Sequence, residues 1–280
     1  MTTGPLCPIT KLEKILLSTD NTDNSEGAIR EAIKFASKCS SKIYACMTIG
    51  SNPEYETIGS NYFQKEVDAA NEHLKSIKTR AEEAGLTCET IFHESMPIAQ
   101  TIVEDATAKE VDIIAIGRHG YQGIAKLLMG EVAAEVISDA PCKVLVVPKA
   151  AQIGYKKILV ATDGSSHAVA AVHEAITIAK KAGSHLIALS VIRDESERME
   201  AENITGAVLE MAQKEGLTAE ALTPLGKPSN VIVETAGGMG VDLIVMGTYG
   251  KTGIKKLLMG SSTEKVIGSA GCAVFVVKSE

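Results

Sequence analysis

The chain has 280 residues, 45% hydrophobic and 22% charged, a composition typical of about two globular domains of ~140 residues each. Its net charge of −7, the absence of Trp and an aromatic content of only 4% argue against nucleic-acid binding, which needs a basic surface. Because it shows neither an apolar run of the ~18 residues that a membrane span needs nor the start of a signal peptide, we expect a cytoplasmic protein without a membrane partner.

Three apolar segments occur twice along the chain. They are KILLSTD and KILVATD (residues 14–20 and 157–163), VDIIAIG and VDLIVMG (111–117 and 241–247), and PCKVLVV and GCAVFVV (141–147 and 271–277). The offset between the copies falls from 143 to 130, so the first copy has 13 extra residues, which we place around residues 53–63. We expect a mobile loop or an added helical turn there, over the mouth of the first copy. The repeat predicts two domains, residues 1–150 (the first repeat) and residues 151–280 (the second repeat).

Short apolar runs alternate with longer segments of helical spacing in each repeat. In the second repeat we expect strands at residues 157–162, 185–192, 217–223, 241–247 and 272–278, and helices at 167–183, 195–216, 228–238 and 261–270. Val169, Val172, Ala175 and Ile176 are predicted to form one buried helical stripe. Strands that alternate with helices indicate an α/β fold in which a parallel sheet is covered on both faces. Each repeat is therefore predicted to be a doubly wound, five-stranded parallel-sheet domain.

The last strand of each repeat is an apolar edge strand. Such edges tend to aggregate unless they are covered. We therefore expect the two last strands to pack against each other, so that the chain is a pseudo-dimer of its own repeats. The six cysteines form no C-x-x-C pair and lie mostly in apolar runs, so we expect reduced core thiols.

One glycine pattern follows the fourth strand of each repeat. In the second repeat Gly247, Gly250 and Gly260 precede three hydroxyl side chains, Ser261, Ser262 and Thr263. Glycines allow tight turns and close approach of the backbone to a ligand, and a helix that starts near Gly260 offers unpaired amides to an anion. The pattern indicates a phosphate site. A simpler alternative is that Ser261 and Glu264 form a helix capping box, with no ligand involved.

The first repeat keeps the glycines of this pattern but not the hydroxyls. Gly117, Gly120 and Gly130 retain the spacing, whereas Glu131, Val132 and Ala133 follow them. A carboxylate at the helix start would fill the anion site with the protein's own charge. The first repeat also has a net charge of −6, against −1 for the second, so we expect an anionic ligand in the second repeat only.

No catalytic residue and no metal site is predicted. His93 and His119 lack metal-ligand spacing and are expected at the surface or in support of a neighbouring site residue. Lys251, Lys255 and Lys256 are expected to be solvated charges, with the alternative that Lys251 reaches a phosphate at the mouth of the crevice. A Walker A loop is excluded because Val245 stands where its first glycine belongs.

The glycine and hydroxyl spacing, the segment ATDGS at residues 161–165 and the terminal CAVFVVK together resemble the universal stress protein family, in tandem. The resemblance implies strand order 3-2-1-4-5 in each domain and an ATP or AMP site between the first and fourth strands. The binding residues implied in the second repeat are Ala161, Asp163, Val191, Met246, Gly247, Gly250, Gly260, Ser261, Ser262 and Thr263.

The function predicted from these features is that of a nucleotide-binding regulator of the stress response, which acts through an unnamed protein partner and could also form a homodimer. One alternative is a slow ATPase that uses Mg²⁺ held by the triphosphate. Another is an interaction scaffold that binds no nucleotide.

Overall fold

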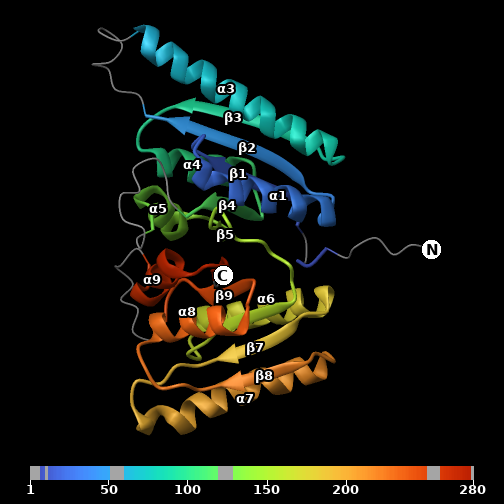
Figure 1. Cartoon of the computed structure of the whole chain (residues 1–280), viewed down its shortest axis with the longest axis vertical. Helices are drawn as coiled ribbons and strands as arrows, with labels where there is room; N and C mark the ends of the chain where they lie inside the picture. Colours follow the sequence, from blue (N-terminus) through green and yellow to red (C-terminus); the bar gives the residue numbers. More distant parts are fainter. Residues whose placement is uncertain (1–6, 10–11, 51–59, 119–128, 251–258, 279–280) are drawn as a thin grey trace, which may run out of the picture.

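The structure is a computed structural model that describes residues 7–9, 12–50, 60–118, 129–250 and 259–278. In these residues one ten-stranded sheet runs the length of the molecule, with helices on both faces (Figure 1). The strand order is β3-β2-β1-β4-β5-β10-β9-β6-β7-β8. Each half of the sheet therefore has the order 3-2-1-4-5, which confirms the predicted doubly wound α/β fold of both repeats.

The first repeat contains the elements β1 (Lys14–Thr19), η1 (Asp23–Ser25), α1 (Glu26–Cys39), β2 (Lys42–Ile49), α3 (Ser60–Glu83), β3 (Cys88–Glu94), α4 (Ile98–Ala108), β4 (Ile113–Gly117), α5 (Glu131–Asp139) and β5 (Lys143–Val147). The second contains β6 (Lys157–Ala161), α6 (Ser166–Ala182), β7 (His185–Leu189), η2 (Glu195–Glu197), α7 (Arg198–Lys214), β8 (Ala219–Leu222), α8 (Pro228–Met239), β9 (Leu243–Gly247), α9 (Ser261–Ser269) and β10 (Ala273–Val277). Helices α1, α3, α6 and α7 contribute to the core on one face of the sheet, and α4, α5, α8 and α9 to the core on the other. Among these helices none combines the length and apolar character needed to cross a bilayer.

Helix α6 shows how local sequence sets its position. The side chain of Ser165 accepts a hydrogen bond from the Ala168 amide at the start of the helix, and Gly183 ends it in the left-handed region at φ 70°. Val172, Ala175 and Ile176 are buried as predicted. Val169 is 44% exposed, so its predicted place in the buried stripe is wrong. Alanines at positions 168 and 171 take that face instead because they let the helix lie close to the sheet.

An aspartate at the equivalent position of each repeat holds the start of the first strand by hydrogen bonds. Asp112 Oδ2 accepts hydrogen bonds from the amides of Glu13 and Lys14, at 2.8 and 2.9 Å. Asp242 accepts from the amides of Tyr155 and Lys156, both at 2.9 Å. Each carboxylate satisfies two backbone donors at or just before the first residue of the strand. This explains why the pair Val-Asp precedes the fourth strand in both repeats.

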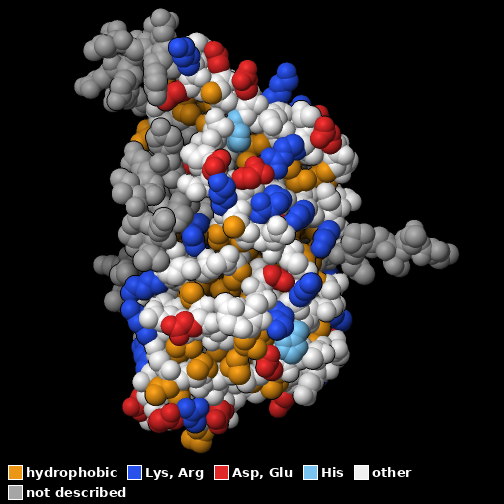
Figure 2. Space-filling model, viewed as in Figure 1, with side chains coloured by type: hydrophobic (Ala, Val, Ile, Leu, Met, Phe, Trp, Pro, Cys, Tyr) orange, Lys and Arg blue, Asp and Glu red, His pale blue; other side chains and the backbone are white. Residues whose placement is uncertain are grey.

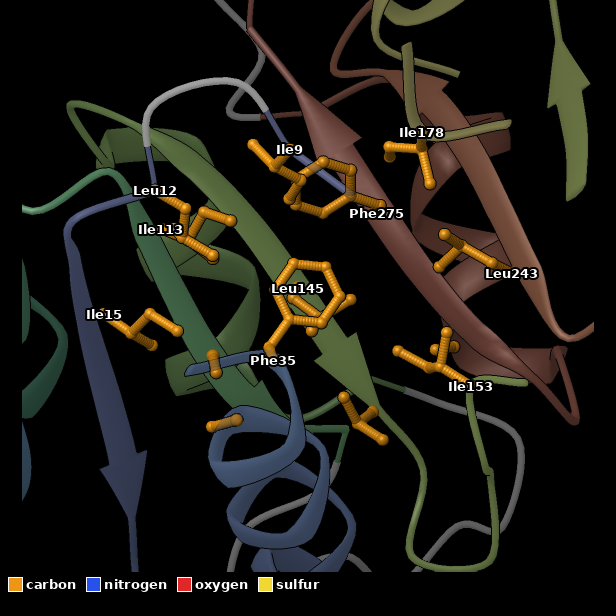
Figure 3. Close-up of a cluster of buried hydrophobic side chains, with 14 of the residues drawn as sticks. Ile9, Leu12, Ile15, Phe35, Ile113, Leu145, Ile153, Ile178, Leu243 and Phe275 are labelled. Atoms are coloured by element: carbon orange, nitrogen blue, oxygen red, sulfur yellow. The ribbon is translucent and has the colours of Figure 1, made fainter. Parts of the chain in front are cut away.

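The two repeats join through their last strands. β5 pairs antiparallel with β10, with Leu145 opposite Phe275. Figure 3 shows Phe275 among side chains from both repeats, including Leu145 and Ile9. Phe275 is 1% exposed and Leu145 is 2% exposed. The predicted pseudo-dimer is confirmed, and the pairing removes both apolar edges. We call the region around the β5–β10 pairing the seam.

Part of the predicted insertion lengthens a helix. Helix α3 has 24 residues, whereas its counterpart α7 has 17. Residues 60–63 belong to α3, which confirms the added helical turn, and residues 51–59 lie outside the described residues.

Over the face shown in Figure 2, basic and acidic side chains are interspersed.

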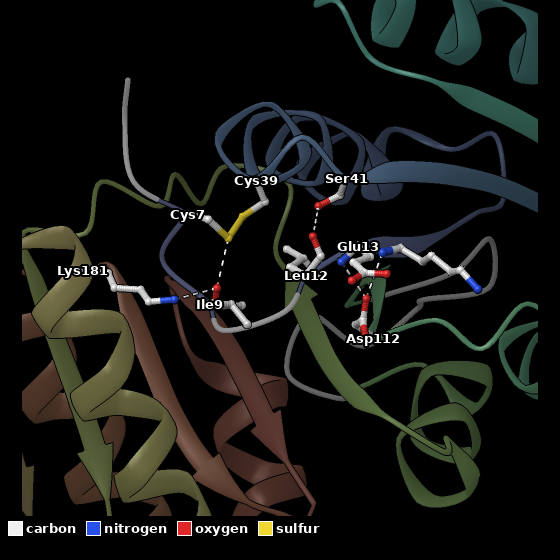
Figure 4. The surroundings of a disulfide bond; sticks show 9 residues. Cys7, Ile9, Leu12, Glu13, Cys39, Ser41, Asp112 and Lys181 are labelled. Carbon is white, nitrogen blue, oxygen red and sulfur yellow. Dashed lines mark hydrogen bonds between the residues drawn. A yellow bond between two sulfur atoms is a disulfide. The ribbon is translucent and has the colours of Figure 1, made fainter. Parts of the chain in front are cut away.

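The expectation that all six cysteines are reduced is wrong for two of them. Cys7 and Cys39 form a disulfide, with their Cα atoms 4.4 Å apart (Figure 4). Cys39 is the last residue of α1, and the N-terminal segment returns beside that helix end. Cys46, Cys88, Cys142 and Cys272 are free, and the first two are buried as expected.

Candidate functional site

The second repeat contains a cavity of about 380 Å³ at the carboxyl ends of β6, β7 and β9. This is the edge of the sheet where the strand order reverses, the usual ligand position in a doubly wound fold. All ten binding residues implied by the sequence line it: Ala161, Asp163, Val191, Met246, Gly247, Gly250, Gly260, Ser261, Ser262 and Thr263. The fold thus gathers residues from four separate segments of the chain around one space.

One wall of the cavity is the start of helix α9. Gly260 is the N-cap residue, with φ −65° and ψ 132°, and as a glycine it has no side chain that could cap the helix. Ser261 is already the first helical residue, so the capping-box interpretation is wrong. The first intrahelical donor is the amide of Glu264, which donates to Gly260 O at 3.0 Å. The amides of the three preceding residues have no acceptor within the helix, and the helix dipole adds positive potential there.

Thr263 has a different place from the one predicted for it. Its side chain is 4% exposed, and its hydroxyl donates to Gly247 O at 3.1 Å. The hydroxyl proton therefore fastens α9 to the end of β9 instead of pointing to a ligand. Of the three predicted hydroxyl donors, Ser261 and Ser262 remain.

The glycines of the motif differ in the atoms that lie where a Cβ atom would be. A Cβ atom on Gly247 would lie 2.7 Å from the carbonyl carbon of His167, at the start of α6. The equivalent atom on Gly117 would lie 2.8 Å from Asn24 O, so this glycine serves strand–helix packing in both repeats. A Cβ atom on Gly250 would lie 2.5 Å from Asp163 Oδ2. Gly250 and Asp163 therefore meet across the crevice between β6 and β9.

The floor and second wall include residues that the sequence did not indicate. The connection after β7 and the start of α7 contribute Arg193, Glu197, Glu200 and Ile204, and Tyr249 contributes beside the glycine loop. The Arg193 amide donates to Glu197 Oε2 at 2.9 Å, which holds this connection in place. Tyr249 lies against His167, with 5.3 Å between ring centroids. No spacing motif links these residues to the loop, because only the fold brings α7 beside it.

In the first repeat a histidine reaches the corresponding strand end. His73 of α3 is the counterpart of Ile204, since the helices align through Gly85 and Gly216. His73 Nε2 lies 2.8 Å from Thr19 Oγ1 at the end of β1. Burial lowers the pKa of this imidazole, although Asp20 and Glu26 act in the opposite direction. The imidazole of His73 thus stands where the second repeat has an apolar cavity-lining side chain. This difference is visible in the sequence only when helices α3 and α7 are aligned.

The remaining predictions, most of them for the first repeat, agree with the structure in part. Asp20 directly follows β1, and Asp163 lies two residues after the end of β6. The Asp20 Oδ1 atom accepts hydrogen bonds from the Thr22 amide and hydroxyl at 3.1 and 2.8 Å. Glu131 is the first residue of α5, with Gly130 as N-cap. His93 is partly exposed and its Nε2 lies 2.9 Å from Asp105 Oδ2. The predictions for His119, Gly120, Lys251, Lys255 and Lys256 fall outside the described residues.

Comparison with known proteins assigns the chain to a family. The model of the universal stress protein family matches residues 11–148 and 154–278, so the chain belongs to that family and contains two of its domains. A universal stress protein of Methanocaldococcus jannaschii is 37% identical over 140 residues, which is 44% of this chain and 82% of that protein.

Two solved structures are similar to this chain. The crystal structure of a universal stress protein from Archaeoglobus fulgidus covers 97% of this chain and 100% of its own, with a TM-score of 0.77 at 22% identity. A likeness at that level of identity shows a shared fold. A universal stress protein crystallised in complex with cAMP covers 45% of this chain and 98% of its own, with 27% identity and a TM-score of 0.39.

Proposed function

We propose that the second repeat binds an adenine nucleotide, ATP or AMP, and that nucleotide occupancy controls how this stress protein associates with a protein partner. The observation that supports the proposal most strongly is the cavity itself, which brings a strand-end aspartate, a glycine loop and a helix start to one place. A space of about 380 Å³ is within the usual range for small-ligand sites.

The base and the sugar would occupy the part of the cavity between β6 and β7. Val191 lies just after β7, and in the described part of the chain no backbone hydrogen bond uses its amide or carbonyl. Both groups are therefore available to the edge of an adenine ring. Ala161 and Met246 supply apolar surface beside the ring, and the Asp163 carboxylate would accept hydrogen bonds from ribose hydroxyls.

The phosphates would lie at the start of α9. The amides of residues 261–263, the hydroxyls of Ser261 and Ser262, and the helix dipole form a donor set that suits an anion. Gly250 and Gly260 let the loop lie close to Asp163 and Thr248, since a Cβ atom on them would be 2.5 Å from Asp163 Oδ2 and 3.1 Å from Thr248 O. Among the described residues no group of three or more His, Cys, Asp or Glu side chains could hold a metal ion, so a companion Mg²⁺ would be held by phosphate oxygens and water.

Two differences between the repeats support a single site. Glu131 places a carboxylate where Ser261 offers a hydroxyl, and His73 stands where Ile204 lines the cavity. A carboxylate about 4 Å from a phosphate repels it by ~4 kcal/mol at an effective dielectric constant near 20, before screening by salt. We therefore place the nucleotide in residues 151–280 and regard the first repeat as a domain with a degenerate loop.

Replacing the strand-end aspartate in each repeat tests this assignment. Asp163→Ala is expected to raise the Kd for ATP by about tenfold or more, because it removes a charged acceptor worth ~1.5–3 kcal/mol. Asp20→Ala is expected to change the Kd by less than about twofold, because Asp20 borders the degenerate site. Calorimetric titration of both variants with ATP and with AMP measures the effect.

Equal losses in the two aspartate variants would refute the asymmetry. Absence of any ATP or AMP binding by the wild-type chain, together with no nucleotide released when the purified protein is denatured, would favour the scaffold. Release of inorganic phosphate from bound ATP, above the uncatalysed background, would favour the ATPase.

A further inference from the structure

The described part of the N-terminal segment, residues 7–9 and 12–13, crosses the seam between the repeats. Ile9 is 2% exposed and Leu12 is 4% exposed, and both belong to the core that also contains Phe275. The Ile9 carbonyl accepts a hydrogen bond from Lys181 Nζ, on α6 of the second repeat, at 3.0 Å. Figure 4 shows Lys181 reaching this segment from the second repeat, with the disulfide on the side of the first.

The segment continues directly into β1, and one covalent cross-link also ties its far end to the first repeat. Cys7 is bonded to Cys39 at the end of α1, and on the same side the Ser41 hydroxyl donates to Leu12 O at 2.6 Å and the Lys42 amide to Glu13 O at 2.8 Å. Without the disulfide, the described contacts of the segment are the buried residues Pro8, Ile9 and Leu12, these hydrogen bonds and the bond from the Glu13 amide to Asp112. A segment held by so few contacts has low local stability.

The other four cysteines are poorly suited to react with oxidants. Cys46 and Cys88 are buried, and burial raises the pKa of Cys88 to about 11. Burial likewise raises the pKa of Cys142 to about 12 and that of Cys272 to about 11. The reactive species is the thiolate, which is scarce at neutral pH for such groups. Cys7 and Cys39 are only partly buried and already adjacent.

We propose that Cys7 and Cys39 are a reversible thiol–disulfide site, whose oxidation by a small-molecule disulfide locks the N-terminal segment across the seam. In the oxidising direction one protein thiolate attacks a sulfur of the small disulfide and releases one small thiol. The second protein thiolate then attacks the mixed disulfide and releases the other. Two protein thiols lose two protons and two electrons, and one small disulfide becomes two small thiols.

The two redox states differ in how the seam is covered. In the oxidised chain Ile9 is held beside Phe275, as Figure 3 shows. In the reduced chain the segment can detach, which uncovers apolar side chains from both repeats and removes the bond from Lys181. The oxidised bond also joins two residues 32 positions apart in the unfolded chain, and closing that loop adds stability. The site thus couples the redox state of the surroundings to the joint between the repeats.

Thiol counting and hydrogen exchange on the full chain test this inference. After oxidised glutathione, denaturation and alkylation, we expect four alkylated cysteines per chain, and six after dithiothreitol. In the native protein, reduction is expected to speed amide exchange of the peptide that contains Ile9 and Leu12 by about tenfold or more. Cys7→Ser should show the fast exchange in both conditions. Cys142→Ser, which removes a thiol outside the pair, should respond as the wild type does.

Six alkylated cysteines after oxidised glutathione would overturn the proposal. Formation of the disulfide with no change in exchange at the N-terminal peptide would overturn the lock across the seam. Both readouts are independent of nucleotide, so they distinguish this site from the proposed nucleotide site.

Discussion

Ser261→Glu is expected to abolish ATP binding, with a Kd at least about 100-fold higher than that of the wild type. The substitution removes one donor to the phosphates, worth ~1.5–3 kcal/mol when the acceptor is charged. It also places a carboxylate at the first residue of α9, as Glu131 does at the first residue of α5. Repulsion between that carboxylate and a phosphate adds to the loss. Calorimetric titration with ATP measures the change.

Ser269→Glu is the matched control. It adds the same charge at the exposed last residue of the same helix, ~12 Å from the first, which is beyond the screening length at physiological salt. We expect less than a twofold change in its Kd. Undiminished binding in Ser261→Glu, or an equal loss in Ser269→Glu, would show that the start of α9 does not hold the phosphates.

Gly247→Ala is expected to lower the free energy of unfolding by ~1–3 kcal/mol, measured by urea denaturation without nucleotide. The added Cβ would lie 2.7 and 2.8 Å from the carbonyl carbon and oxygen of His167, both of them backbone atoms. The start of α6 must therefore move away from β9. The cost arises from packing alone, because no ligand is present in the measurement.

Gly237→Ala gives the comparison for that substitution. Gly237 lies in α8, and a Cβ there would meet no atom within 4 Å in the described residues beyond its chain neighbours and its own helix backbone. Alanine favours helix over glycine by ~1 kcal/mol, so this variant should be unchanged or more stable. A Gly247→Ala protein as stable as Gly237→Ala would contradict the account of the strand-end glycine.

The fold was predictable because two copies of one pattern constrain each other. KILLSTD and KILVATD mark the first strand twice, and the apolar last strands had to be covered, which predicted the pairing of β5 with β10. The grouping of the ten site residues was predictable for a related reason. The carboxyl ends of the first and fourth strands of a doubly wound sheet meet at one edge, which brings Asp163 to Gly250.

Other features depend on contacts between distant segments, which one sequence does not display. Cys7 and Cys39 are 32 positions apart, and only the return of the N-terminal segment beside α1 brings them together. Thr263 has the residue type of a phosphate ligand, yet its hydroxyl bonds to Gly247 O because α9 packs on β9. The role of His73 becomes evident only from the contact between its Nε2 atom and Thr19 Oγ1. Val169 follows helical spacing but faces outward, since small side chains occupy the contact with the sheet.

The number of nucleotides bound per chain is the most direct test of the central claim that only the second repeat binds nucleotide. Equilibrium dialysis of the wild-type chain against ATP over a range of concentrations gives that number. We expect one site per chain, and none in Ser261→Glu. Two equivalent sites per chain would show that Glu131 and His73 do not disable the first repeat, and would contradict the asymmetry on which the proposed function rests.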